Sequence, residues 1–209
     1  MAYDNSARAA RARRTRADVV AAAHEAFLDA GYAGTTIRAV AERAGVSPET
    51  VYKGFGNKAT LLKAVYDVAV AGDGEPVPMA ERPDALAVRD SSGPRESARA
   101  YAAMAGGIVE RAGPLTALMA GARGTDPDLD AFAATLDRER LAGATAVTGL
   151  WSDRGWLRTD LTRDRARDVL WTLIGPAVHH ALVGDRGWDR PAYEEWLADT
   201  VSRTLLRPS

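Results

Sequence analysis

The chain has 209 residues, of which 46% are hydrophobic and 26% charged, with a formal net charge of −1 and no cysteine. This composition allows a packed core and argues against global disorder, and the lack of thiols excludes disulfides, thiolate metal sites and cysteine nucleophiles. No uncharged run is long enough to cross a bilayer and no secretory signal opens the sequence, so we expect a cytoplasmic protein without a membrane segment.

The charge is unevenly distributed along the chain. Residues 1–60 carry nine lysines and arginines against six acidic residues, a net +3, which leaves −4 for the remainder. A basic front joined to an acidic remainder suggests a nucleic-acid-binding module fused to a second module. Five arginines lie close to the N-terminus: Arg8, Arg11, Arg13, Arg14 and Arg16. Residues 1–14 are predicted as a basic arm, which either solubilises the chain or contacts DNA phosphates or the minor groove.

The first two predicted helices follow this arm. Apolar residues recur at helical spacing over 15–30, and Gly31 ends the helix. Either Thr35 or Thr36 caps a second, short helix, which ends at Gly45.

Good cap residues bound the next two helices. Ser47 is a favourable N-cap, and Pro48 fits the first helical position because its missing N–H has no partner to lose there. This third helix is short, over 49–52, and the glycines at 54 and 56 interrupt it. Asn57 caps a fourth helix whose apolar face runs to Gly72.

The remainder of the chain is also predicted to be helical after a long loop. Residues 72–95 are rich in glycine and proline and show little periodicity, so we expect a loop with at most one helical turn. Further helices are predicted at about 95–111, 114–122, 127–153, 163–183 and 190–206. No segment alternates at period two. The predicted fold class is all-α, with about nine helices.

Residues 35–58 form the strongest functional pattern. Two short helices flank Ala44-Gly45-Val46, a tight turn with glycine at its centre, which is typical of a helix-turn-helix. The second helix of such a motif enters the major groove of DNA. Ser47 and Thr50 offer hydrogen bonds, Tyr52 a hydroxyl, and Lys53 and Lys58 positive charge for phosphates. The alternative is an ordinary helical hairpin with solvated polar residues.

A longer pattern surrounds this segment: Ala30-Gly31-Tyr32-Ala33-Gly34-Thr35-Thr36-Ile37, then Val40-Ala41, then Ala44-Gly45-Val46-Ser47, then Thr50-Val51-Tyr52-Lys53-Gly54-Phe55 with Asn57-Lys58 and Leu61-Leu62. This pattern resembles the N-terminal domain of TetR-type transcriptional regulators. The resemblance covers about residues 15–70. It implies a three-helix DNA-binding domain, joined by a fourth helix to a divergent helical ligand-binding domain, in a homodimer.

The resemblance also implies roles for individual residues. Thr36 would touch phosphate, Tyr52 and Lys58 would hold phosphates, and Phe55 would be core. The residues that would face the groove are Ser47, Pro48, Glu49, Thr50 and Lys53. Gly54 stands where the family often has histidine or another bulky polar residue, so any phosphate contact from that side chain is lost here.

The C-terminal half contains every tryptophan of the chain and is predicted to hold an apolar effector cavity. Its predicted lining residues are Tyr101, Met104, Met119, Phe132, Trp151 and Trp171. The alternative for most of them is plain core packing. The last two predicted helices carry wide apolar stripes, and we expect a homodimer interface that includes Val178, Leu182, Trp196 and Thr200. In the TetR-like family these two helices form a four-helix bundle across a two-fold axis.

These predictions combine into a ligand-responsive DNA-binding regulator, expected to act as a repressor on palindromic operator DNA. The predicted parts are the arm 1–14, a DNA-binding domain 15–56, a connecting helix 57–71 and a ligand-binding and dimerisation domain 72–209. We expect no enzyme activity, cofactor or metal, because the phosphate-loop, serine-elbow and zinc-protease motifs are missing. Two alternatives remain: a small-molecule-binding protein or enzyme with a vestigial helix-turn-helix, and a helical interaction protein that binds no DNA.

Overall fold

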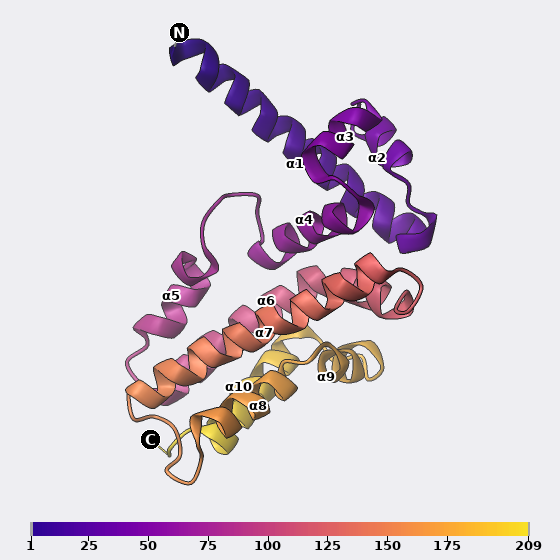
Figure 1. The fold of residues 1–209 in the computed structure, drawn as a ribbon. Coiled ribbons are helices and arrows are strands. Elements are labelled where there is room, and N and C mark those ends of the chain that lie inside the picture. The colour runs from indigo at the N-terminus through magenta and orange to yellow at the C-terminus, as the bar shows by residue number, and fades with distance from the viewer. Residues whose placement is uncertain (1, 209) are drawn as a thin grey trace. The chain divides into compact units, whose positions relative to one another are not determined.

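The computed structural model describes residues 2–208, and helices follow one another along this whole stretch (Figure 1). The α-helices are α1 (Ala2–Gly34), α2 (Ile37–Arg43), α3 (Pro48–Phe55), α4 (Lys58–Ala71), α5 (Pro83–Asp90), α6 (Pro94–Gly121), α7 (Pro127–Asp153), α8 (Arg163–Leu173), α9 (Pro176–His179) and α10 (Arg190–Leu205). A 3₁₀ turn, η1 (Met79–Glu81), and a π-helical turn, η2 (His180–Gly184), complete the set. Over residues 2–208 there is no strand, and the all-α prediction is confirmed.

The caps of the N-terminal helices follow from local sequence. The side chains of Thr36, Ser47 and Asn57 each accept a hydrogen bond from the backbone N–H three residues further on. Each therefore satisfies one of the donors that the first turn of a helix leaves unpaired. Thr36 is the cap of α2, because the hydroxyl of Thr35 is buried and donates to the carbonyls of Ala26 and Gly31 at 3.0 and 2.7 Å.

Two N-terminal helices are longer than predicted. α1 begins at Ala2, so the predicted arm 1–14 is helical from that residue and continuous with the predicted helix 15–30. Alanine and arginine, which dominate this stretch, are both strong helix formers. α3 runs through Gly54 to Phe55 and ends at Gly56, whose φ of 78° is open to glycine at little cost. The predicted interruption at Gly54 was wrong.

Further boundaries differ around prolines. Residues 95–111 and 114–122, predicted as two helices, are parts of the single helix α6, which continues through Pro114. An internal proline removes only one helical hydrogen bond, and here Leu115 and Met119 beyond it are buried. The predicted loop 72–95 contains α5, an eight-residue helix.

The predicted helix 163–183 is broken at Gly175. α8 ends at Leu173, and Gly175 takes an extended conformation before Pro176 begins α9. Proline disfavours helical backbone in the residue before it, which explains the break. The four residues of α9 then lead into η2. A π-helical turn is rare and often marks a functional position.

The chain divides into two compact units. The N-terminal unit comprises the residues up to Gly74 together with Pro114–Ala133, and the C-terminal unit comprises Glu75–Gly113 and the chain from Ala134 onward. This division differs from the single domain 72–209 expected from the sequence, because the segment from the middle of α6 to the start of α7 groups with the helix-turn-helix.

Each unit has its own apolar core. In the N-terminal unit α1 packs against α2 and α4, and its core includes Val19, Phe27, Val40, Val51 and Leu61. In the C-terminal unit the core is built around Trp151, Leu170, Tyr193, Leu197 and Val201. Within residues 2–208, no helix has both the length and the apolar character needed to cross a bilayer.

Candidate functional site

Helix α3 presents two different faces. Val51 and Phe55 are buried against the N-terminal unit, while Thr50, Tyr52 and Lys53 are exposed. Tyr52 is 55% exposed, which is unusual for a large aromatic side chain that serves only packing. The helix thus carries a polar, partly aromatic surface on a rigid support, as a helix that reads DNA requires.

The N-terminal end of α3 is ordered by its own side chains. Ser47 Oγ accepts from the backbone N–H of Thr50 at 3.3 Å and lies 3.2 Å from the hydroxyl of Thr50. The backbone N–H of Glu49 and the hydroxyl of Ser47 lower the pKa of the Glu49 carboxyl, so it stays ionised. An ionised carboxylate repels phosphate but accepts a hydrogen bond from the amino group of cytosine, and Glu49 is therefore suited to a base edge.

Lys58 is held inside the N-terminal unit. Its ammonium donates to the carbonyl of Tyr32 at 2.7 Å and lies 4.1 Å from the centroid of the Tyr32 ring. The side chain is half-buried, so it is less accessible to phosphate than the exposed Lys53. Phosphate binding by Lys58 stays a prediction, and any such contact would compete with the bond to Tyr32.

A polar network ties this region to the start of α7. The hydroxyl of Tyr32 donates to Asp126 at 2.9 Å, and the side-chain amide of Asn57 donates to Asp128 at 3.1 Å. The hydrogen bond from Tyr32, together with the charge of Lys58, lowers the pKa of Asp126. Burial and the neighbouring carboxylates raise the pKa of Tyr32, which therefore remains a neutral donor. We call these residues the α4–α7 latch: Tyr32, Asn57, Lys58, Asp126 and Asp128.

Sequence reasoning did not assign a contact to Arg16, which the structure joins to α3. Its guanidinium donates to the carbonyl of Gly54 at 3.3 Å and lies 4.4 Å from the centroid of the Phe55 ring. Arg16 belongs to the arginine-rich run near the N-terminus, but that run does not predict its contact with Gly54, because the two residues are 38 positions apart.

The predicted effector residues are divided between the two units. Met119 and Phe132 belong to the N-terminal unit, whereas the others belong to the C-terminal unit. Trp151 is fully buried, and its indole N–H donates to Ser97 Oγ at 2.9 Å, which makes it a core anchor. Tyr101 packs against it edge to face. Two surface hollows of the C-terminal unit, of about 620 and 850 Å³, include none of the six predicted residues in their linings.

Among the described residues of the C-terminal unit, two aromatic side chains carry a buried hydrogen-bond donor that has no partner. They are the hydroxyl of Tyr193, on α10, and the indole N–H of Trp171, on α8. Arg140, from α7, stacks on the Trp171 ring at 4.1 Å and donates to the Trp171 carbonyl at 2.8 Å. Tyr101, from α6, lies close enough to Tyr193 and to Arg140 for both to influence its pKa.

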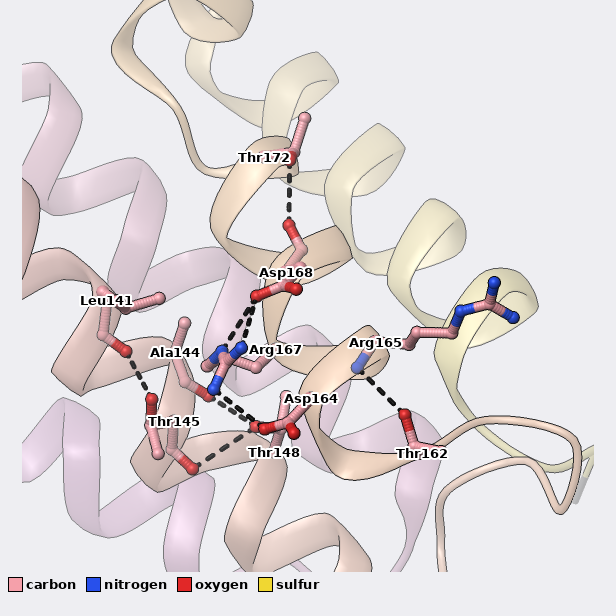
Figure 2. A network of polar contacts seen from close by, with 10 residues as sticks. All are labelled: Leu141, Ala144, Thr145, Thr148, Thr162, Asp164, Arg165, Arg167, Asp168 and Thr172. Carbon is pink, nitrogen blue, oxygen red and sulfur yellow. Dashed lines mark hydrogen bonds and ion pairs between the residues drawn. The ribbon is translucent and has the colours of Figure 1, made fainter.

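Most polar groups nearby are satisfied, which makes these two exceptional. Figure 2 shows the hydroxyls of Thr145, Thr148 and Thr172 donating to carbonyls of their own helices, and Arg167 paired with Asp164 and Asp168. A buried donor without an acceptor costs about 1–3 kcal/mol, so each such group calls for an explanation. Burial raises the pKa of Tyr193 to about 12, so its hydroxyl remains protonated and able to donate. Within residues 2–208 no group of His, Asp and Glu is arranged to hold a metal ion.

His179 is expected to make stability depend on pH. Its ring packs edge to face on Tyr193 with centroids 5.0 Å apart, and burial followed by the nearby His180 lowers its pKa. The unfolded chain then takes up this proton more readily than the folded chain. Stability contributed by neutral His179 is therefore present above the unfolded pKa of about 6.5 and is lost as the pH falls below it.

We expect His179→Gln to flatten the fall in the urea midpoint between pH 7.5 and 5.5. His180→Gln is the comparison: this exposed neighbour contributes to the lowered pKa of His179 only after burial, so its removal should flatten the fall less than the His179 change does. An unchanged pH profile in the His179 variant would contradict the assignment.

The predicted dimer residues belong to α9, η2 and α10 of the C-terminal unit. Trp196 and Thr200 line the 620 Å³ hollow on α10 together with Trp188. Trp196 is half-buried and packs against the rings of Trp188 and Tyr193, with centroids 6.4 and 5.9 Å away. Val178 and Leu182, on α9 and η2, are also half-buried.

Known proteins share the helix-turn-helix segment of this chain. The family described as bacterial regulatory proteins, tetR family, matches residues 19–65. The HTH-type transcriptional regulator TtgR of Pseudomonas putida is 45% identical over 56 residues, a match that spans 27% of this chain and 27% of TtgR.

Solved structures extend the likeness of the fold over nearly the whole chain. The structure of NalD, the secondary repressor of the MexAB-OprM multidrug efflux pump of Pseudomonas aeruginosa, has a TM-score of 0.69 at 23% identity, covering 94% of this chain and 98% of NalD. FadR of Bacillus subtilis in complex with stearoyl-CoA has a TM-score of 0.68 at 16% identity, covering 88% and 96%. Residues 19–65 of the chain are therefore similar to the helix-turn-helix domain of the bacterial regulatory proteins of the tetR family, and the likeness over the rest of the chain is one of fold.

Proposed function

We propose that this protein is a cytoplasmic, homodimeric repressor that binds a palindromic operator and releases it when a small molecule binds its C-terminal unit. The observation that carries the proposal is the exposed polar face of α3, in a helix-turn-helix that matches the TetR family. In this proposal the N-terminal unit binds DNA, and the C-terminal unit binds the effector and the second subunit.

The proposed contacts divide into positioning and reading. Thr36 and Tyr52 are exposed and suited to phosphate, and Lys53 can bind either phosphate or a guanine edge. Thr50 and Glu49 are suited to bases. Ser47 is engaged in capping, so it contributes chiefly by ordering the start of α3.

The α4–α7 latch supports a route from effector to DNA. Tyr32 is next to the α1–α2 corner, and Asn57 and Lys58 begin α4, so all three belong to the helices that position α3. Their partners Asp126 and Asp128 stand at the start of α7. An effector that favours one position of α7 would bias the latch, and coupling free energies between such sites are typically about 1–3 kcal/mol.

The unpartnered donors of Tyr193 and Trp171 suggest that the effector has polar groups. Both groups are donors, so the ligand that satisfies them carries hydrogen-bond acceptors, such as carbonyl or carboxylate oxygens. The aromatic side chains around them favour a planar or apolar body. Structures of the same fold have been solved with ligands as different as stearoyl-CoA and choline, which supports small-molecule binding without naming the ligand.

The test of the proposed function is operator selection followed by release. The full-length protein is incubated with a random duplex library, and we expect enrichment of palindromic sites whose retention weakens as salt increases. A compound library is then screened for release of the selected site. Failure to retain duplex DNA would favour the interaction protein that binds no DNA. Turnover of a compound without DNA binding would favour an enzyme with a vestigial helix-turn-helix.

Tyr193→Phe and Trp171→Phe are expected to separate effector binding from folding. Each removes an unsatisfied buried donor, so the affinity for a releasing compound should fall by about 1–3 kcal/mol. The free energy of unfolding should stay equal or rise in Tyr193→Phe, which keeps its ring, whereas Trp171→Phe also reduces the ring on which Arg140 stacks and should lose some stability. Operator binding without the compound should not change. Intrinsic tryptophan fluorescence reports binding of the effector to the C-terminal unit, because all five tryptophans lie at position 151 or later.

The control for this pair is Thr172→Val. Thr172 is on α8 beside Trp171, but its hydroxyl already donates to the Asp168 carbonyl at 2.8 Å and is exposed (Figure 2). Unchanged effector affinity in both Tyr193→Phe and Trp171→Phe would place the effector elsewhere.

A further inference from the structure

Residues 7–14 of α1 are all exposed, and the first buried residue after them is Val19. Two helical turns therefore project beyond the core of the N-terminal unit, at the indigo end of the ribbon (Figure 1). No apolar side chain larger than alanine occurs between residues 7 and 18, so this segment cannot bury an apolar face.

The charge of this extension has a single sign. Arginine is the only charged residue type between Asp4 and Asp18, where it occurs five times in nine consecutive positions, 8–16. Like charges three or four residues apart on a helix destabilise it. The extension is therefore a surface whose repulsion a polyanion would relieve. Because its arginines point in all directions around the axis, it lacks the two-faced character of a helix that binds a membrane surface.

The root of the extension is fixed beside the end of the recognition helix. Arg16 bonds to the carbonyl of Gly54 and covers the ring of Phe55, and both of these residues belong to the last turn of α3. Arg13 is one turn further out on the same side of α1. At about 1.5 Å per residue, Arg11 lies only ~8 Å along the axis from Arg16. The run of arginines thus starts beside the C-terminal end of α3.

We propose that residues 7–16 form a helical arm that binds the phosphate backbone of duplex DNA next to the groove occupied by α3. This inference rests on the proposed function and extends it, because it adds a contact outside the helix-turn-helix. The arm binds phosphates without reading bases, since arginines distributed around a helix offer charge but no fixed register. Its occupant is duplex DNA rather than a lipid surface or a protein.

The first test removes the charge of the arm. The variant Arg11→Gln/Arg13→Gln/Arg14→Gln is compared with Arg99→Gln/Arg165→Gln/Arg186→Gln, which neutralises three exposed arginines of the C-terminal unit. At about 0.9 per phosphate contact, the arm variant should lower the slope of log affinity against log salt by about 0.9 for each of its three arginines that faces the DNA, and by no more than about 2.7 for each bound subunit. Its hydroxyl-radical footprint should shorten at the flanks, while the preferred operator sequence stays the same.

The second test keeps the charge and breaks the helix. Ala12→Pro leaves all five arginines in place but is incompatible with a continuous helix through the arm. A helical arm predicts that this variant also loses flanking protection and part of the salt slope. A flexible charged tail predicts wild-type values for both, and that result would overturn the proposal. Val19 and the rest of the core lie more than one turn away, so unfolding temperatures should match the wild type.

The outcomes separate the arm from the function on which it rests. If the wild type and the control variant bind no operator, the proposed function fails. If they bind and the arm variant retains the full slope and footprint, only the arm is contradicted. A loss of binding to anionic vesicles with no change on DNA would assign the arginines to a membrane surface and also overturn the proposal.

Discussion

Lys53→Glu is expected to lower operator affinity about 30-fold or more. Lys53 is exposed on the last turn of α3. A lost phosphate or base contact costs at least about 1 kcal/mol, and the change occurs in both subunits of a dimer, so the loss is at least ~2 kcal/mol. The introduced carboxylate also repels the phosphates, which increases this loss. Fluorescence anisotropy with labelled operator at several salt concentrations measures the effect.

The comparison with a distant charge reversal makes this result specific. Arg165 is an exposed residue of α8 in the C-terminal unit. Arg165→Glu changes the net charge of the chain by the same amount as Lys53→Glu. We expect it to weaken operator binding far less than Lys53→Glu, through long-range repulsion alone. Equal losses in both variants would mean that net charge, rather than contact by α3, determines affinity.

Trp196→Glu is expected to give a folded monomer with greatly reduced operator affinity. In the isolated subunit Trp196 is half-buried at the edge of the α10 hollow, so a glutamate there can reach solvent and folding should survive. In a dimer joined through this face, the same carboxylate would be buried without a partner, at a cost of several kcal/mol. A monomer binds one half-site at a time and forfeits the roughly 10²–10⁴-fold gain of linked binding.

Sedimentation velocity and operator titration on the same samples test this pair of effects. Leu141→Glu is the control, because Leu141 is a 38% exposed apolar side chain of α7 and lies outside the hollow. The control should remain dimeric. If the Trp196 variant also sediments as a dimer, the interface lies on another face.

Local signals in the sequence were sufficient for the helix-turn-helix. Cap residues such as Ser47 and Asn57 act on backbone groups three positions away, and the turn between α2 and α3 depends on one glycine, Gly45, with a φ of 67°. The buried and exposed residues of α3 follow from helical periodicity. Because these determinants are only a few residues apart, the caps and the two faces of the motif could be predicted.

Helix length around proline and glycine depended on tertiary packing instead. Pro114 lies inside α6 with buried residues beyond it, whereas Pro176 follows a break at Gly175. Both prolines weaken a helix locally by the same mechanism, yet the sequence pattern predicted a helix end before Pro114 and a continuous helix through Pro176. Whether a helix continues is decided by the packing gained on the far side, which local pattern does not contain.

The polar contacts on which the proposals rest could not be predicted from the sequence, because they join residues that are far apart along the chain. Tyr32 and Asp126 are 94 residues apart, and Arg16 and Gly54 are 38 apart. The unpartnered hydroxyl of Tyr193 is a property of its whole surroundings, since burial removes water and no neighbouring helix supplies an acceptor. Residue type and spacing identified the helix-turn-helix and the chemistry that α3 offers. Only the folded chain shows which of the other polar groups are paired, buried or left free to bind a ligand.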